Sequence, residues 1–161
     1  MRPSLLILAA AAAVFVWTTS GLLPETVASH FGASGHPNGF MTRTFYIGFM
    51  LVVIVGVPLL LTAVTGMALS SPNARINLPN RDYWLAPERR QDTVEFLRLH
   101  AARFASMLVV FLCYVHWLVV RANDVDPPRL DARWLIGGLV VFTAGLVLWV
   151  TLLFNRFRIR P

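Results

Sequence analysis

The sequence predicts an all-α integral membrane protein with four transmembrane helices in a single domain, residues 1–161. Three observations support this fold class. First, the chain is 57% hydrophobic and only 14% charged, whereas about a quarter of the residues in a soluble domain are charged. Second, four apolar runs are each long enough to cross a bilayer. Third, arginines gather in alternate connections between these runs, which is typical of cytoplasmic loops.

The four predicted spans account for more than half of the chain. A helix rises about 1.5 Å per residue and must cross about 30 Å, so a span needs about 20 apolar residues. Such runs cover about residues 4–23, 44–69, 99–120 and 133–154. None of them contains an acid, and Arg103 is the one charge well inside them. The remainder, mainly an outer loop 24–43 and an inner loop 70–98, is too short for a separate catalytic domain.

The arginines predict that both termini lie in the cytoplasm. Nine precede the first span, lie between the second and third, or follow the fourth: Arg2, Arg75, Arg81, Arg89, Arg90, Arg98, Arg156, Arg158 and Arg160. Four fall on the other side, where acids accompany them: Arg43, Arg121, Arg129 and Arg133. This asymmetry places loop 24–43 outside the cytoplasm. It also explains the net charge of +6 by contact with the lipid bilayer rather than with nucleic acid. We expect the first span to be a retained anchor rather than a cleaved signal peptide.

The outer loop has the composition of a structured element. We expect a short extended piece, a glycine-rich turn and a return into the membrane. Gly32 and Gly35 permit backbone angles that other residues avoid, and Pro37-Asn38-Gly39 predicts a turn. His30 is expected to fix the loop by a hydrogen bond to backbone or to a polar neighbour. The predicted ligand- or partner-binding residues are Pro24, Glu25, His30, His36, Pro37, Asn38 and Gly39.

The inner loop is predicted to form an amphipathic segment that makes a cytoplasmic contact through Tyr83, Trp84, Arg89 and Arg90. The two aromatic rings are expected at headgroup level, with arginines reaching lipid phosphates. Pro87 suits the first turn of a helix that continues unbroken into the third span. Glu95 and Arg98 are spaced to pair on the surface of that helix.

The histidines give only weak signals for chemistry. His30 and His36 are metal candidates with Glu25 as the nearest third ligand, but a complete site needs three or four ligands. His100 and His116 flank the third span about 160° apart around the helix, so they cannot hold one haem together. We expect His116 at the outer interface and His100 near the inner headgroups or Glu95. Motifs for a catalytic triad, a phosphate loop or dinucleotide binding are missing from the sequence, so we assign no catalytic residue, metal or cofactor.

The segments Leu23-Pro24-Glu25 through His30-Phe31 and Gly35-His36-Pro37-Asn38-Gly39-Phe40 resemble a bacterial membrane family of unknown function. That domain also forms the amino-terminal part of SdpI-type immunity proteins. The resemblance covers about residues 5–65, and Asn38 stands where the family often has Asp. Its motif positions here are Pro24, His30, Pro37 and Gly39. It implies a small bacterial inner-membrane protein, and in SdpI-type relatives it implies protection against a secreted toxin with signalling through a captured regulator.

The sequence therefore leads to one main functional hypothesis and two rivals. The main hypothesis is a non-catalytic membrane protein that acts by binding, in immunity, sensing or signalling. The alternative is an accessory subunit or assembly factor that contacts a membrane protein partner or a second copy. It is motivated by glycine-marked faces on the second span, with Gly48, Gly56 and Gly66, and on the fourth, where Gly138 and Gly145 share one face. The third is a metal or haem redox protein, motivated by the four histidines.

Overall fold

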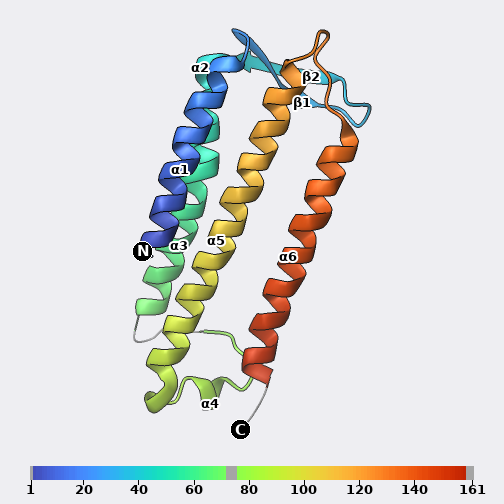
Figure 1. The fold of residues 1–161 in the computed structure, drawn as a ribbon. Coiled ribbons are helices and arrows are strands. Elements are labelled where there is room, and N and C mark those ends of the chain that lie inside the picture. The colour runs from blue at the N-terminus through green and yellow to red at the C-terminus, as the bar shows by residue number, and fades with distance from the viewer. Residues whose placement is uncertain (1, 72–75, 159–161) are drawn as a thin grey trace.

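Four long helices stand side by side in the computed structural model, which describes residues 2–71 and 76–158 (Figure 1). The first is α1 (Pro3–Thr19) with a 3-10 turn, Ser20–Leu22, and the second joins α2 (Arg43–Leu51), a π-helical turn (Val52–Gly56) and α3 (Val57–Ser70). The third and fourth are α5 (Pro87–Asn123) and α6 (Ala132–Arg158), and all four are long and apolar enough to span a membrane. This confirms a multi-pass membrane protein. Arg75 and Arg160, counted above on the cytoplasmic side, lie outside the described residues.

A β-hairpin connects the first two spans, so the prediction of an all-α protein is wrong for the outer loop. Strands β1 (Thr26–Phe31) and β2 (Pro37–Thr42) pair antiparallel. The segment is rich in β-branched and aromatic side chains such as Val27 and Phe40, which favour extended backbone. The hairpin lies across one end of the bundle, which we call the hairpin end (Figure 1). The opposite end carries the short helix α4 (Arg81–Trp84), and we call it the α4 end.

The second span passes Pro58 by changing its helical hydrogen bonding. Proline has no N–H and its ring crowds the preceding turn, so the sequence predicts a kink there. The structure places a π-helical turn at Val52–Gly56, directly before this proline, and the N–H of Val57 donates to the carbonyl of Val52. This hydrogen bond joins residues five apart, as in a π-helix, and accommodates the disruption caused by Pro58. The span therefore stays continuous from Arg43 to Ser70.

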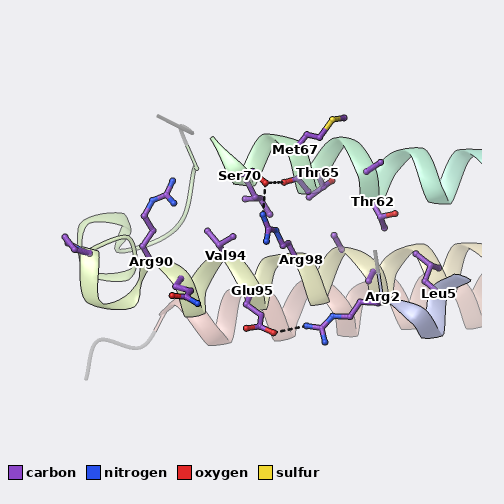
Figure 2. Close-up of a pocket in the computed structure, with 17 residues that line it drawn as sticks. Arg2, Leu5, Thr62, Thr65, Met67, Ser70, Arg90, Val94, Glu95 and Arg98 are labelled. Atoms are coloured by element: carbon purple, nitrogen blue, oxygen red, sulfur yellow. Dashed lines mark hydrogen bonds and ion pairs between the residues drawn. The ribbon is translucent and has the colours of Figure 1, made fainter. Parts of the chain in front are cut away.

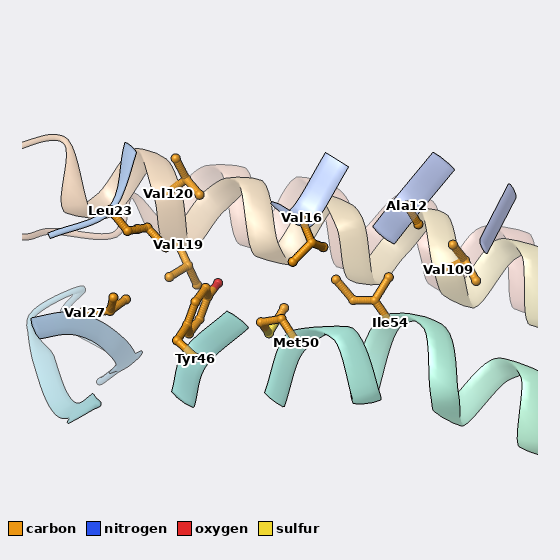
Figure 3. Close-up of a cluster of buried hydrophobic side chains, with 10 residues drawn as sticks. All are labelled: Ala12, Val16, Leu23, Val27, Tyr46, Met50, Ile54, Val109, Val119 and Val120. Atoms are coloured by element: carbon orange, nitrogen blue, oxygen red, sulfur yellow. The ribbon is translucent and has the colours of Figure 1, made fainter. Parts of the chain in front are cut away.

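The core lies between α1, the α2–α3 span and α5, and it continues up to the hairpin (Figure 3). Ten buried apolar side chains form it: Ala12, Val16, Leu23, Val27, Tyr46, Met50, Ile54, Val109, Val119 and Val120. Val27 belongs to β1 and is fully buried. The hairpin is thus anchored through the same apolar cluster that packs the three helices.

Helix α6 packs along α5 and is otherwise little covered. Phe157 is its one buried residue over Ala132–Arg158. Gly138 faces Tyr114 so closely that a Cβ at this position would overlap the ring, and a Cβ at Gly145 would be 3.1 Å from the Cε of Met107. Both glycines therefore accommodate α5 of the same chain. The predicted unbroken helix from Pro87 into the third span is confirmed as α5.

Candidate functional site

The hairpin has a defined register with two compensating irregularities. Thr26 pairs with Thr42 and Ala28 with Phe40, after which His30 pairs with Gly39. The register shifts once on each strand, between Ala28 and His30 on β1 and between Gly39 and Pro37 on β2. Such bulges bend and twist a hairpin without breaking the pairing. The strands can therefore curve over the helix ends while their backbone groups stay paired.

The turn of the hairpin docks on the connection between α5 and α6. Gly35 has φ +79°, and a Cβ there would overlap the carbonyl oxygen of Leu130. The N–H of Leu130 donates to the carbonyl of Gly35 at 2.9 Å, and the N–H of Gly35 donates to that of Gly32 at 2.9 Å. Only glycine combines this backbone angle with so close an approach. The two connections on this end of the bundle are consequently joined backbone to backbone.

Asn123, the last residue of α5, holds β1 from the side. Its Oδ1 accepts from the N–H of Ala28 at 2.9 Å, and its Nδ2 donates to the carbonyl of Ala28 at 2.9 Å. The amide side chain thus takes the place of a neighbouring strand for one residue. Arg43 adds a second support, because its Nη1 donates to the carbonyl of Leu23 at 2.9 Å. Neither contact is predictable from the sequence pattern, since both join residues distant in the chain.

The predicted binding residues of the outer loop all lie on or beside this hairpin. Five of the seven are exposed, namely Pro24, Glu25, His30, His36 and Asn38. The other two, Pro37 and Gly39, are half-buried. The predicted turn at Pro37-Asn38-Gly39 is wrong, because these residues begin β2 and the turn spans Gly32–His36. Proline is tolerated at the start of an edge strand, where its missing N–H costs no ladder bond. His30 lies against Gly39, where an added Cβ would be 3.0 Å from the Cβ of His30.

A buried polar network with His116 at its centre lies directly beneath the hairpin. The side chain of His116, expected at the outer interface, is fully buried between three helices. The hydroxyl of Tyr46 lies 2.9 Å from its Nδ1, and Oγ1 of Thr19 lies 2.8 Å from its Nε2. The network therefore joins α1, α2 and α5 (Thr19, Tyr46 and His116).

The hydrogen-bond pattern is satisfied by the tautomer of His116 that carries its proton on Nε2. When Oγ1 of Thr19 donates its single proton to the carbonyl of Phe15, 2.6 Å away, it accepts from Nε2–H of the imidazole. Nδ1 is then the acceptor for the hydroxyl of Tyr46. A neutral imidazole satisfies every partner, which matters because unpaired polar groups are costly in this environment. The sequence does place Thr19, Tyr46 and His116 near the same ends of three spans. It does not show that their side chains meet.

The predicted inner contact residues lie at the α4 end with their side chains at least partly covered. Trp84 is buried, its ring meets Phe157 edge to face at 5.5 Å, and its Nε1 donates to the carbonyl of Phe157 at 3.2 Å. The guanidinium of Arg89 lies 4.0 Å from the ring centre of Tyr83. Arg90 donates through Nη2 to the carbonyl of Ser71 at 3.0 Å. Trp84 thus packs α4 onto the end of α6 instead of facing headgroups.

His100 and Glu95 differ from their expected roles. His100 is buried, stacked between Phe96 at 5.5 Å and Trp149 at 4.3 Å. Nε1 of Trp149 donates to the backbone carbonyl of His100. Glu95 pairs with Arg2 at 3.2 Å rather than with Arg98. Helix α6 explains the position of His100, because Trp149 presents a flat apolar partner that the sequence pattern of α5 alone does not show.

The described residues, 2–71 and 76–158, contain no group of three or more His, Cys, Asp or Glu side chains placed to hold a metal ion. His30 and His36 are both exposed on the hairpin. Both ring nitrogens of His116 are engaged in the network above. The geometry thus gathers polar groups for hydrogen bonding within the fold.

Comparison with known proteins adds one finding. Residues 5–56 match the family described as a domain of unknown function, DUF1648. The match covers α1, the hairpin, α2 and the π-helical turn, and it ends at Gly56 rather than at about residue 65. This confirms the coarse part of the resemblance, a membrane-type domain of unknown function. No curated protein matches the chain, and no solved structure matches it.

Proposed function

We propose that this is a bacterial inner-membrane protein that acts by binding at its hairpin end, in the manner of SdpI-type immunity proteins. The observation that carries the proposal is the way the hairpin is built. Its backbone is fixed to α5 by Asn123 and to the α5–α6 connection by Gly35, yet His30, His36, Asn38 and Phe40 stay exposed. A fixed backbone that presents several exposed side chains loses little conformational entropy when it binds.

In this proposal the distribution of arginines sets the orientation of the protein in the membrane. The α4 end would face the cytoplasm and the hairpin the outside, where a secreted toxin or another external ligand reaches it. A cysteine-labelling experiment tests this directly. In a Cys113→Ala background, Asn38→Cys should react with a membrane-impermeant maleimide in intact cells, whereas Arg81→Cys on α4 should react only after lysis. The opposite pattern would remove the external ligand from the proposal.

A growth assay tests binding by the hairpin. Cells lacking the gene are challenged with culture medium from a strain that secretes the candidate toxin, and survival is measured after complementation. The wild-type chain should restore growth, and the double variant His30→Ala/Phe40→Ala should not, at equal amounts in the membrane. Phe154→Ala on α6 is the matched control, because Phe154 is 56% exposed against 58% for Phe40. Equal growth with both variants would contradict the proposed role of the hairpin.

The alternative of an accessory subunit has less support from the structure than from the sequence. On α6, the space beside Gly138 is occupied by Tyr114 and the space beside Gly145 by Met107, both from α5 of the same chain. What still favours a partner is the largely uncovered α6, although lipid covers such a surface equally well. Purification in a gentle detergent decides between them, since an accessory subunit should elute with a stoichiometric partner.

A further inference from the structure

A cavity of about 1000 Å³ lies between α3 and α5 at the α4 end, next to the beginning of α1 (Figure 2). The first span, Pro3–Leu22, has 20 described residues and the second, Arg43–Ser70, has 28, or about 30 Å against about 42 Å. The first span ends at the hairpin and the second begins near it, and the described part of α1 does not extend along the last turns of α3.

One part of the cavity is cationic. Arg2, Arg90 and Arg98 line it, against the single carboxylate of Glu95. Nη2 of Arg98 donates to Oγ of Ser70 at 2.7 Å, and Nη2 of Arg2 pairs with Glu95 at 3.2 Å (Figure 2). A guanidinium has five N–H donors, so Arg2 and Arg98 each keep donors beyond these bonds. Their planar groups match the oxygens of a phosphate.

The other part is apolar and reaches the membrane-facing surface. Leu5, Val94 and Ala102 are buried in its wall, whereas Met67 is 67% exposed at its edge. Arginines that only capped the carbonyl end of α3 would require neither a cavity of this size nor Arg2, which precedes α1. We propose that this cavity binds an anionic phospholipid of the bilayer, with the phosphate at the arginines and the upper acyl chain along the apolar wall.

The proposal is independent of the hairpin function, and the full chain in a neutral detergent is sufficient to test it. Native mass spectrometry counts the lipids that remain bound after addition of phosphatidylglycerol or phosphatidylcholine with the same acyl chains. The wild type should retain the anionic lipid with an apparent affinity about tenfold higher or more. Glycerol 3-phosphate, which has the phosphate without the chains, should not displace it at similar concentrations.

Two variants probe the two parts of the cavity separately. Arg2→Gln/Arg98→Gln should lower the affinity for phosphatidylglycerol on the order of tenfold, while Arg81→Gln/Arg158→Gln, which removes the same two charges outside the cavity, should not. Gly66→Leu fills the cavity without changing charge, because nothing lies within 4 Å of a Cβ at Gly66. Its control is Gly48→Leu on α2, where a Cβ is equally unobstructed.

Each outcome decides the matter. Selective retention of phosphatidylglycerol that is lost in Gly66→Leu and kept in Gly48→Leu supports the site, even if the arginine variant fails to fold. Equal retention of both lipids by the wild type overturns it. Displacement by glycerol 3-phosphate at lipid-like concentrations also overturns it, because the ligand would then be a soluble phosphate ester rather than a lipid.

Discussion

The two ends of the bundle are held together by different chemistry. At the hairpin end, directional hydrogen bonds join distant segments, through Asn123 to Ala28 and through His116 to Tyr46 and Thr19. At the α4 end, stacked rings and arginine faces contribute as much as hydrogen bonds such as that from Trp84 to the carbonyl of Phe157, as where Arg156 lies 4.3 Å from the ring centre of Trp84. Hydrogen bonds fix both distance and orientation, whereas ring contacts tolerate adjustment.

This difference suits the roles proposed for the two ends. A recognition surface needs one geometry, and the hairpin obtains it from backbone contacts and a buried network. A lipid site needs less exact geometry, and the α4 end combines arginines on flexible stems with an apolar wall. Substitutions at the two ends should therefore differ in cost, and the following four run from the largest expected effect to the smallest.

The largest effect is expected from His116→Ala, which removes the centre of the buried network. It leaves the hydroxyls of Tyr46 and Thr19 with one partner fewer each and opens a void between three helices. The free energy of unfolding should fall by about 2–4 kcal/mol, measured by mixed-micelle denaturation followed by circular dichroism. The exposed His36→Ala is the control and should change it by less than about 0.5 kcal/mol. Equal losses in both would show that the network contributes nothing.

Gly35→Ala should have the next largest effect. The new Cβ is strained at φ +79° and overlaps the carbonyl oxygen of Leu130, so we expect a loss of about 2 kcal/mol. The matched control is Gly32→Ala in the same turn, where a Cβ meets only ordinary contacts at 3.7 and 3.8 Å. Thermal midpoints of the two variants in one detergent make the comparison. A midpoint for Gly35→Ala no lower than that for Gly32→Ala would be inconsistent with the docked turn.

Asn123→Ala should loosen the hairpin with a smaller cost to the whole protein. Losing both bonds to Ala28 should favour local opening by about 1–2 kcal/mol, or roughly 5- to 30-fold in population. Trypsin cleavage after Arg43, which requires such opening, reports it. Asn38→Ala on the exposed side of β2 should leave the cleavage rate unchanged, and an unchanged rate in Asn123→Ala would argue against the anchor.

The smallest effect is expected at the α4 end, from Trp84→Phe. The carbonyl of Phe157 also accepts from Nδ2 of Asn80 at 3.0 Å, so it stays satisfied when the indole N–H is lost. The aromatic contact with Phe157 remains, and the loss in unfolding free energy should stay below about 1 kcal/mol. Tyr83→Phe serves as the reference in the same melting experiment. A loss as large as that of His116→Ala would erase the contrast between the two ends.

The sequence predicted the spans well because length and apolar composition are local properties. It also predicted the start of α5 at Pro87, since proline at a helix start acts locally. The hairpin register was not predictable, because it depends on two bulges and on Gly35 meeting Leu130. For the same reason the partners of His116 were missed, since Tyr46 and Thr19 lie 70 and 97 residues away in the chain.

The predicted site residues show the same division. Composition was enough to find the outer loop, and His30, His36 and Asn38 are exposed there as a binding surface requires. It did not distinguish the exposed side chains from Asn123 and Gly35, which hold the loop in place. At the α4 end, amphipathic composition suggested that Trp84 faces the headgroups, whereas packing against Phe157 buries it.

The central claim is that the hairpin is a fixed part of the fold rather than a mobile loop. Hydrogen exchange of the full chain in lipid nanodiscs tests it at the amides of Ala28 and Leu130, which donate to Asn123 and Gly35. We predict protection comparable to that of amides in the middle of α5. Exchange of both amides at the rate of an unstructured peptide would contradict the account.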